Sequence, residues 1–192
     1  MAFSKPQEVV AQFHLQSGLT VADFGTGSGA YALALARAVG ASGRVYAVDI
    51  QKEVLARLAR EAKASDLEAK LPRGSLASRI EVIRGDLEQT QGSTLADQSV
   101  DFVVIANLLF QVSAKYNLVR EAKRILKSNG QVAFIDWSGS FGGLGPKPEQ
   151  VLLPAEAKKI FAEAGFVFLH EFPAGDQHYG LLFESDSQKP KS

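Results

Sequence analysis

The feature that most constrains the fold is a regular alternation of short apolar runs with amphipathic segments. Runs such as 43–50 and 99–107 are rich in β-branched residues, which predicts strands buried on both faces. Segments such as 51–63 instead repeat apolar residues at the helical period. Alternating strands and helices form a largely parallel sheet with helices on both faces. We expect strands at 19–25, 43–50, 79–86, 99–107 and 130–137, and helices at 30–39, 51–63, 114–126 and 154–165, with Ser128-Asn129-Gly130 ending the helix before the last of these strands.

The carboxyl-terminal part departs from this alternation. Residues 166–172 and 178–184 both have the pattern of strands, and only Pro-Ala-Gly-Asp-Gln separates them. That connection is too short for a crossover helix, so the two strands must be antiparallel. The sequence therefore predicts an α/β fold with a doubly wound, mostly parallel sheet and an antiparallel last strand. We expect a single domain over residues 1–184 and a disordered tail over 185–192.

Composition narrows the class of function. Lys+Arg and Asp+Glu both number 21, and this zero net charge makes a nucleic-acid partner unlikely. The chain has no cysteine, which removes disulfides, thiolate metal sites and a thiol nucleophile. The first residues lack the apolar core of a signal peptide, and no run approaches membrane-spanning length. We expect a cytoplasmic protein without membrane insertion, and the sequence sets no oligomeric state.

A glycine-rich stretch follows the first predicted strand. Gly25, Gly27 and Gly29 stand at alternate positions in "VADFGTGSGA". A turn without side chains lets a ligand approach the backbone closely, and ligands of such sheets bind at the carboxyl ends of the strands. The dinucleotide fingerprint is spaced G-x-G-x-x-G, whereas this stretch is spaced G-x-G-x-G. The alternative is that the glycines serve only a tight turn.

Three carboxylates stand at the ends of the first three predicted strands. Asp49 can accept hydrogen bonds from both hydroxyls of a ribose, and Asp86 can accept one from the exocyclic amine of a base. With Asp23 they would repel a pyrophosphate, yet they suit a ligand that carries an ammonium and a sulfonium. Each of them could instead cap a helix or lie in solvent at a strand end.

These motifs resemble those of a known family. "VADFGTGSG", "VYAVDI", "IRGDL" and "VDFVVIAN" are similar to successive motifs of the class I S-adenosylmethionine-dependent methyltransferases, over about residues 7–184. The resemblance implies a seven-stranded sheet of order 3-2-1-4-5-7-6. It also implies S-adenosylmethionine as the cofactor, with S-adenosylhomocysteine as its product and without a metal. Asn107, at the end of the fourth strand, would offer its carbonyl to the methionine ammonium.

The resemblance also assigns the other cofactor contacts. The glycines would line the methionine part, and Asp23 would orient its amino group, directly or through water. Asp49 would hold the ribose hydroxyls and Asp86 the adenine amine, while Ile50 and the backbone of Leu87 would face the adenine ring. The implied cofactor-binding set is Asp23, Phe24, Gly25, Thr26, Gly27, Gly29, Asp49, Ile50, Gly85, Asp86, Leu87 and Asn107.

Motifs and residues that the chain lacks exclude several classes of methyl acceptor. The stretch 106–110, "ANLLF", lacks the Asn/Asp-Pro-Pro-aromatic motif of many amino-directed methyltransferases. Cytosine C5 and arsenite methylation use cysteines, which are absent, and Asp101 and Asp136 do not suggest the clustered acids of a magnesium site. A small, partly apolar molecule is the predicted acceptor, since the expected acceptor edge carries Leu108, Leu109, Phe110, Trp137 and Phe141.

Three alternative functions stay open. The basic stretch 70–79 would suit an RNA or protein substrate, although such a stretch is usually a solvated loop. The chain could also bind S-adenosylmethionine without catalysis. An NAD(P)-dependent oxidoreductase is disfavoured, because Arg120 stands where short-chain dehydrogenases with a tyrosine such as Tyr116 carry lysine. The loop 138–150, with Phe141 and Leu144, is either a lid over the acceptor or an ordinary connection.

Two residues are candidates for catalysis. If the last strand, 178–184, pairs antiparallel with the fifth, 130–137, the start of the last strand lies beside the end of the fifth. Asp136 and His178 then reach the same edge of the sheet. The carboxylate of Asp136 would then orient the imidazole of His178 as a general base. The alternative is that Asp136 caps a turn and His178 pairs with the hairpin backbone. His14 and His170 are expected on the surface of a helix and a strand.

Overall fold

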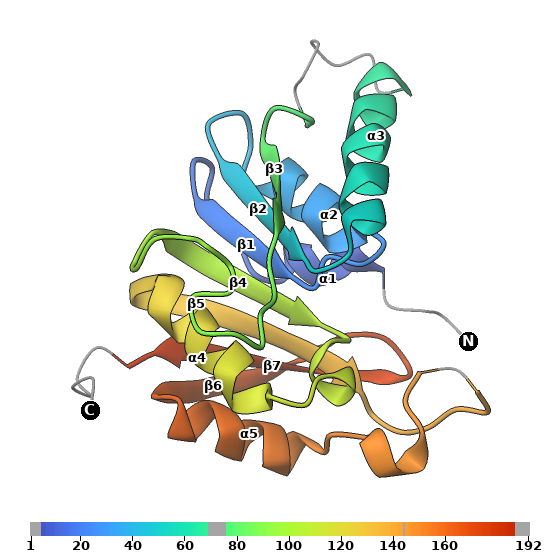
Figure 1. Cartoon of the computed structure of the whole chain (residues 1–192), viewed down its shortest axis with the longest axis vertical. Coiled ribbons are helices and arrows are strands. Elements are labelled where there is room, and N and C mark those ends of the chain that lie inside the picture. Colours follow the sequence, from blue (N-terminus) through green and yellow to red (C-terminus); the bar gives the residue numbers. More distant parts are fainter. Residues whose placement is uncertain (1–4, 69–75, 144, 187–192) are drawn as a thin grey trace.

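A seven-stranded sheet forms the centre of the molecule (Figure 1). The computed structural model describes residues 5–68, 76–143 and 145–186. The strand order is β3-β2-β1-β4-β5-β7-β6, and β7 runs antiparallel to its neighbours β5 and β6 while β1 to β5 are parallel. The predicted fold class and strand order are therefore confirmed. The strands are β1 (Thr20–Phe24), β2 (Arg44–Asp49), β3 (Ile80–Arg84), β4 (Val100–Ala106), β5 (Leu126–Trp137), β6 (Phe166–Pro173) and β7 (His178–Ser185).

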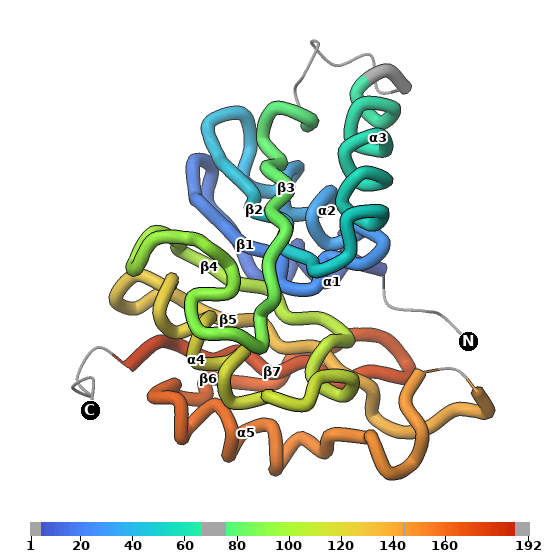
Figure 2. Tube along the Cα trace, in the orientation of Figure 1, coloured from blue at the N-terminus to red at the C-terminus, as the bar shows by residue number. Residues whose placement is uncertain are grey.

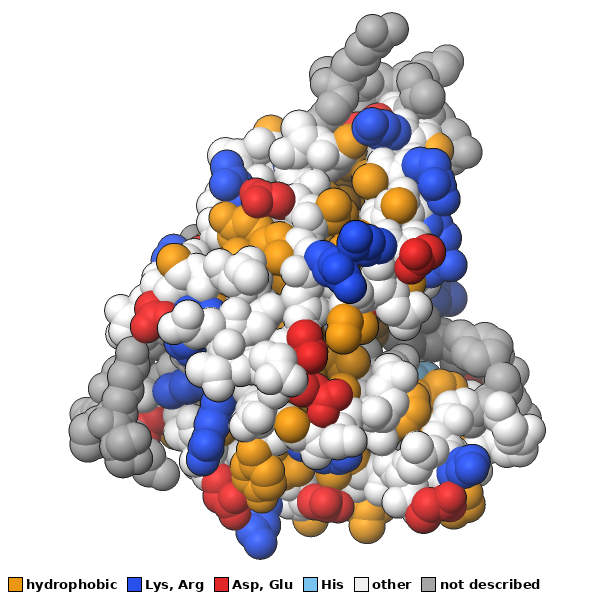
Figure 3. Space-filling view, viewed as in Figure 1, with side chains coloured by type: hydrophobic (Ala, Val, Ile, Leu, Met, Phe, Trp, Pro, Cys, Tyr) orange, Lys and Arg blue, Asp and Glu red, His pale blue; other side chains and the backbone are white. Residues whose placement is uncertain are grey.

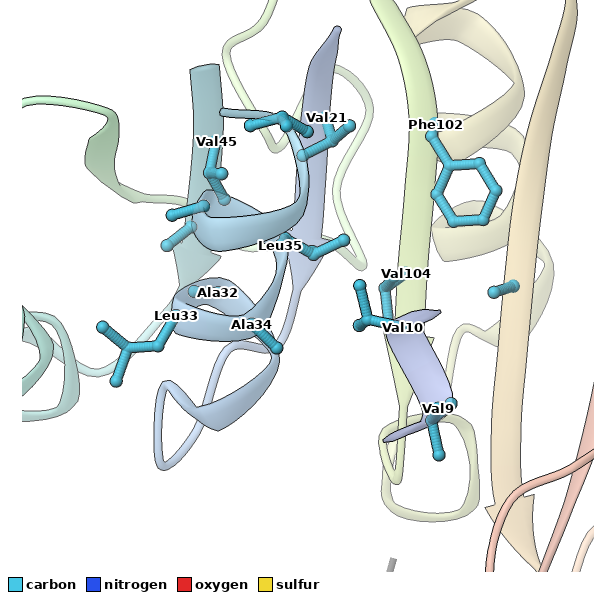
Figure 4. Packing of buried hydrophobic residues seen from close by; sticks show 14 of the residues in the cluster. Val9, Val10, Val21, Ala32, Leu33, Ala34, Leu35, Val45, Phe102 and Val104 are labelled. Carbon is cyan, nitrogen blue, oxygen red and sulfur yellow. The ribbon is translucent and has the colours of Figure 1, made fainter. Parts of the chain in front are cut away.

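Helices cover both faces of the sheet. Side chains of α1, α2 and α3 form one apolar cluster with β1, β2 and β4, and those of α4 and α5 form a second with the opposite face. Figure 4 shows part of the first cluster, directed into the layer between helices and sheet. In the second, the rings of Phe161 and Phe183 stack at 4.2 Å. The helices are α1 (Pro6–Ala11), α2 (Ala30–Ala38), α3 (Lys52–Glu68), α4 (Lys115–Ile125) and α5 (Pro154–Glu163), with short 3₁₀ turns η1 (Leu109–Gln111) and η2 (Pro148–Gln150).

The connection from β3 to β4 contains no helix in the part of the chain described, 85–99 (Figure 2). A buried carboxylate on α4 holds it instead: Glu121 accepts hydrogen bonds from the backbone N–H and the hydroxyl of Ser93, and Nη2 of Arg124 donates to it at 2.7 Å. Burial alone would raise the pKa of Glu121, but the bonds from Arg124 and Ser93 hold it below its usual value. The carboxylate therefore stays charged and fully paired while it ties this connection to α4.

Strand β5 starts earlier than the sequence predicts. We expected Ser128-Asn129-Gly130 to end the preceding helix, yet α4 ends at Ile125 and β5 begins at Leu126. The pairing with β4 shifts register between Val100 and Phe102, which lie opposite Leu126 and Gln131. Asn129 is left-handed there, with φ 61°. The stretch read as a helix stop is thus a bulge inside a strand.

Two further boundaries differ from expectation. Helix α3 continues beyond the predicted 51–63, to Glu68. Ser185, assigned to the tail, is the last residue of β7, and the N–H of Asp186 donates to the carbonyl of Gly165. The rest of the expected tail, 187–192, lies outside the described residues. Within the described residues, no helix combines the length and the apolar character needed to cross a membrane.

Candidate functional site

The glycine-rich turn crosses from β1 to α2 over the end of β2. The N–H groups of Gly25 and Thr26 both donate to the carbonyl of Val48, at 2.8 and 3.2 Å, and the N–H of Gly29 donates to the carbonyl of Thr26 at 2.7 Å. Gly25, Gly27 and Gly29 are left-handed, with φ of 69°, 49° and 82°. Glycine adopts this conformation without the steric cost that a Cβ brings. The turn therefore requires glycine even before any ligand is considered.

The three glycines face different surroundings. A Cβ on Gly29 would lie 2.5 Å from Cδ1 of Leu58 on α3, so this glycine permits close packing of the turn against that helix. A Cβ on Gly25 would lie 2.7 Å from the side chain of Leu108. At Gly27 the nearest atom is a backbone oxygen 3.7 Å away, so its Cβ position is open. Of the three glycines predicted to line a ligand, Gly27 has the free space.

A cavity of about 260 Å³ adjoins this turn. At its edge, Asp49 accepts hydrogen bonds from the N–H of Gly27 (3.1 Å) and of Gln51 (2.9 Å). Figure 3 shows acidic side chains near the middle of this face, with basic and apolar ones beside them. The structure thus brings the ends of β1, β2 and β3 together as expected. The lining consists of Gly25, Gly27, Asp49, Ile50, Gln51, Gly85, Asp86, Leu87, Glu88, Leu108, Gln111, Val112 and Leu118.

The other predicted cofactor residues lie behind or beside this lining. Phe24 is fully buried in the second apolar cluster, and Thr26 donates its hydroxyl to Oδ2 of Asp23 at 2.6 Å. Asp23 is only 2% exposed. Burial raises the pKa of Asp23 to about 6, against the opposing bond from Thr26 and together with the charge of Asp49. Asp23 is therefore a buried acid under the turn.

Four buried side-chain atoms lack a hydrogen-bond partner among the described residues. They are Oδ1 of Asn107, Oδ2 of Asp136 and both ring nitrogens of His178. Asn107, left-handed at φ 54°, follows β4, and its N–H donates to the carbonyl of Ile135 next to Asp136. Its own carbonyl, expected to face a ligand ammonium, accepts from Nε2 of Gln111 at 3.0 Å. An unpaired buried polar group costs about 1–3 kcal/mol, so this edge of the sheet is suited to a polar ligand.

The expected contact between Asp136 and His178 is wrong. The two residues do reach the same edge, but the register pairs Asp136 with Tyr179 and Trp137 with His178. Because side chains alternate along a strand, Asp136 and His178 point to opposite faces of the sheet. Asp136 is 1% exposed, and burial raises its pKa to about 7, against the hydrogen bond from the N–H of Trp137 to Oδ1, the backbone dipole of Phe110 and the charge of Lys115. Burial lowers the pKa of His178, whose ring packs on Trp137 at 4.3 Å.

The loop 138–150 folds back onto Trp137. A Cβ on Gly145 would lie 2.5 Å from the indole ring, and the ring of Phe141 lies 6.3 Å from it. Leu144 lies outside the described residues, as does most of the basic stretch 70–79. Of the apolar residues expected at the acceptor edge, Leu109 is fully buried in the second cluster. Trp137 and Phe141 lie beside each other at this edge.

The sequence analysis missed several lining residues. Gln111 lines the cavity from η1, Val112 from the residue after it, Leu118 from α4 and Glu88 from the loop after β3. No sequence motif marks them, because they reach the site only through the packing of α4 beside that loop. The one local sequence feature that could have pointed to Glu88 is its position two residues after Asp86, a predicted cofactor residue.

The geometry agrees with comparisons to known proteins. A family model described as a methyltransferase domain matches residues 22–134. An arsenite methyltransferase from Aquipseudomonas alcaligenes is 36% identical over 123 residues, 64% of this chain and 34% of that protein. A demethylmenaquinone methyltransferase from Bacillus velezensis is 30% identical over 125 residues, 65% of this chain and 48% of that protein. The chain thus spans about a third to a half of the length of these curated relatives.

A solved structure supports the same class. A SAM-dependent methyltransferase from Aquifex aeolicus superposes with a TM-score of 0.79 at 28% identity, covering 95% of this chain and 90% of that one. Sheet order, glycine turn and strand-end acids define a Rossmann-like methyltransferase fold. The chain belongs to the class I S-adenosylmethionine-dependent methyltransferase family.

The two glycines at the end of the turn should respond differently to alanine. Gly29→Ala places a Cβ against the fully buried Leu58, in a left-handed conformation, and should lower the free energy of unfolding by about 2–4 kcal/mol. Gly27→Ala meets open space and should cost about 1–2 kcal/mol from its backbone conformation alone. Urea unfolding of both variants measures this, and equal losses would contradict the packing role of Gly29.

Asp23→Asn should stabilise the protein in a pH-dependent way. Because the folded-state pKa of Asp23 is raised to about 6 from 3.8, its ionisation destabilises the fold as the pH rises through that window. The variant should be more stable than the wild type by about 2–3 kcal/mol at pH 8. The difference should grow between about pH 4 and 6 and stay constant above. Urea unfolding from pH 4 to 8 tests this; a variant less stable at every pH would refute it.

Proposed function

We propose that this chain transfers a methyl group from S-adenosylmethionine to a small, partly apolar organic molecule. The observation that carries the proposal is the open position at Gly27, beside the carboxylate of Asp49 at the edge of the cavity. S-adenosylmethionine, when bound, supplies an electrophilic methyl group on a positively charged sulfur. The task of the protein is then to hold the two reactants in line and to exclude water.

The residues present fit this cofactor. Each oxygen of Asp49 accepts one backbone N–H and keeps a lone pair for a ribose hydroxyl. Ile50 is 53% exposed at the cavity, and a planar base would cover it. We assign Asp86 and Leu87, also in the lining, to the adenine. An ammonium close to Asp23 and to Oδ1 of Asn107 would pair a buried carboxylate and an unpartnered oxygen at once.

Several observations support a small organic acceptor. The relatives named above act on arsenite and on demethylmenaquinone. Arsenite is a soft ligand that thiolates bind, and these 192 residues contain no cysteine. The aromatic pair Trp137 and Phe141 offers an apolar wall. We therefore favour a molecule with an apolar body and a polar reacting group.

We assign proton transfer to Asp136, with His178 as the alternative. Oδ2 of Asp136 is buried and unpartnered, next to Asn107, and can accept a proton from an acceptor hydroxyl or amine. Its pKa of about 7 suits a base near neutral pH. His178 is neutral at that pH, because burial lowers its pKa, and both of its nitrogens also lack partners. The two assignments differ in the pH at which activity should fall.

Cofactor binding is the direct test of the proposed function. Isothermal titration calorimetry should show binding of S-adenosylhomocysteine and none of NAD or NADP. Asp49→Ala should weaken that binding about 10–100-fold, since it removes hydrogen bonds to a charged acceptor. Asp101→Asn is the control, because Asp101 also accepts a backbone N–H, from Thr20, but lies at the amino ends of β1 and β4, away from the carboxyl ends that form the cavity. NAD binding without a response to S-adenosylhomocysteine would refute the proposal.

Transfer itself is measured with S-adenosylmethionine that carries a radioactive methyl group. After incubation with a cell extract, label should appear in the small-molecule fraction. Label in the RNA or protein fraction instead would overturn the choice of acceptor, and binding without any transfer would identify a non-catalytic binding protein.

The pH profile distinguishes the two candidate bases. With the acceptor recovered from the extract, kcat/KM should rise with pH through about 7 and then level off, since Asp136 must be ionised to accept a proton. Asp136→Asn should remove this limb and lower kcat by about 10²–10⁴-fold. His178→Asn should leave the limb in place. A limb below pH 6.5 that disappears only in His178→Asn would show that the base is His178.

A further inference from the structure

The two residues that lead into α4 are bound by a carboxylate from another part of the chain. The N-cap residue of α4, Ala114, has no side chain that could cap the helix. Oε2 of Glu88, in the loop after β3, accepts the N–H groups of Ser113 (2.9 Å) and Ala114 (2.6 Å). The carbonyl of Glu88 in turn accepts Nδ2 of Asn117 at 2.9 Å. One residue of the β3–β4 connection therefore binds the start of α4 through both its side chain and its backbone.

These bonds are of a strong kind. The carboxylate of Glu88 lies at the amino-terminal end of α4, which carries the positive end of the helix dipole, and the N–H of the N-cap residue Ala114 has no partner within the helix. A carboxylate that accepts backbone N–H groups makes charge-assisted bonds, which are shorter and stronger than bonds between neutral groups. The contact between Glu88 and α4 therefore fixes the distance between the two segments as well as holding them together.

The two segments line the same cavity. Asp86, Leu87 and Glu88 belong to its lining, and the N–H of Glu88 donates to Oδ1 of Asp86 at 3.1 Å. The segment 107–114, which leads from β4 into α4, contributes Leu108, Gln111 and Val112 to the same lining. A shift of Glu88 would therefore move both Asp86 and the start of α4.

The segment 107–114 is anchored at both of its ends. At the first end, the N–H of Asn107 donates to the carbonyl of Ile135 at 2.9 Å, and the side chain of Leu108 lies against the backbone of Gly25. At the second end, Oε2 of Glu88 accepts the N–H groups of Ser113 and Ala114. The position of the second end of this segment therefore depends on Glu88.

We propose that Glu88 is a positioning residue for the cofactor, whose carboxylate sets the spacing between the loop 85–88 and the segment 107–114. This inference rests on the proposed function, which assigns Asp86 and Leu87 of that loop to the adenine. Glu88 acts through Asp86 and through α4. By linkage, a ligand that contacts both segments must strengthen the contact between Glu88 and α4 to the same extent that the contact strengthens the binding of the ligand.

Two conservative variants separate positioning from simple helix capping. Glu88→Gln keeps the length of the side chain and an acceptor oxygen, whereas Glu88→Asp keeps the charge but shortens the reach. Positioning predicts that Glu88→Asp weakens S-adenosylhomocysteine binding about 10-fold or more and that Glu88→Gln weakens it only about 3-fold. Charge-dependent capping predicts the reverse order, with Glu88→Asp close to the wild type. Calorimetry measures both, and Asp101→Asn, at the opposite edge of the sheet, should leave the affinity unchanged.

Amide hydrogen exchange supplies a second readout that does not depend on activity. In the wild type, S-adenosylhomocysteine should slow exchange at Ser113 and Ala114, and this protection should be lost in Glu88→Asp. Unchanged affinity and protection in Glu88→Asp would overturn the inference while leaving the proposed function in place. If the wild type does not bind S-adenosylhomocysteine at all, both the proposed function and this inference are refuted. The two failures are therefore distinguishable.

Discussion

The end of β2 holds the turn on which the rest of the site depends. The carbonyl of Val48 accepts two N–H groups of the turn, and Asp49 accepts a third from Gly27. These bonds keep the three alternate glycines of the turn in left-handed conformations that other residues avoid. The same turn delivers the chain to α2 and lets it pack against Leu58 of α3. Loop conformation, helix packing and the open space at Gly27 are thus consequences of one small hydrogen-bonded unit.

The treatment of buried polar groups differs between two parts of the molecule. Away from the carboxyl edge, buried carboxylates are fully engaged: Glu121 binds Ser93 and Arg124, and Asp66 accepts the N–H groups of Leu76 and Ala77. At the ends of β4 and β5 and the start of β7, buried atoms of Asn107, Asp136 and His178 have no partner among the described residues. Buried polar atoms are normally hydrogen-bonded, so the unpaired atoms at this edge indicate a place where a bound molecule supplies the missing partners.

Periodicity predicted most of the fold because each strand and helix is a local pattern. The apolar runs of β1, β2 and β4 are buried on both faces, as such runs require, and the short link between β6 and β7 allowed only an antiparallel pair. The order of the strands came from the resemblance to a family. The prediction failed on which face of the sheet each side chain points to. Asp136 and His178 do reach the same edge, but Asp136 pairs with Tyr179, so the side chains of Asp136 and His178 lie on opposite faces.

Other residues escaped prediction because their partners are distant in sequence. Glu88 meets the start of α4 through contacts with Ser113 and Ala114 that no motif records. Gly29 belongs to a recognisable turn, but its role against Leu58 appears only once α3 is in place. A pattern along the chain shows which residues share a face, whereas the neighbour across a gap is set by tertiary packing.

The bulge between α4 and β5 determines which way the acid at the far end of the strand points. Extra residues between Leu126 and Gln131 bring β5 into step with β4 before the strand crosses the sheet. From there each position alternates, so that Asp136 emerges toward α4 and Trp137 toward the opposite layer. Deleting or inserting a single residue among 127–130 and keeping the pairing upstream would exchange these two side chains. The number of residues in the bulge at one end of β5 thus determines which side chain, Asp136 or Trp137, faces α4 at the other end.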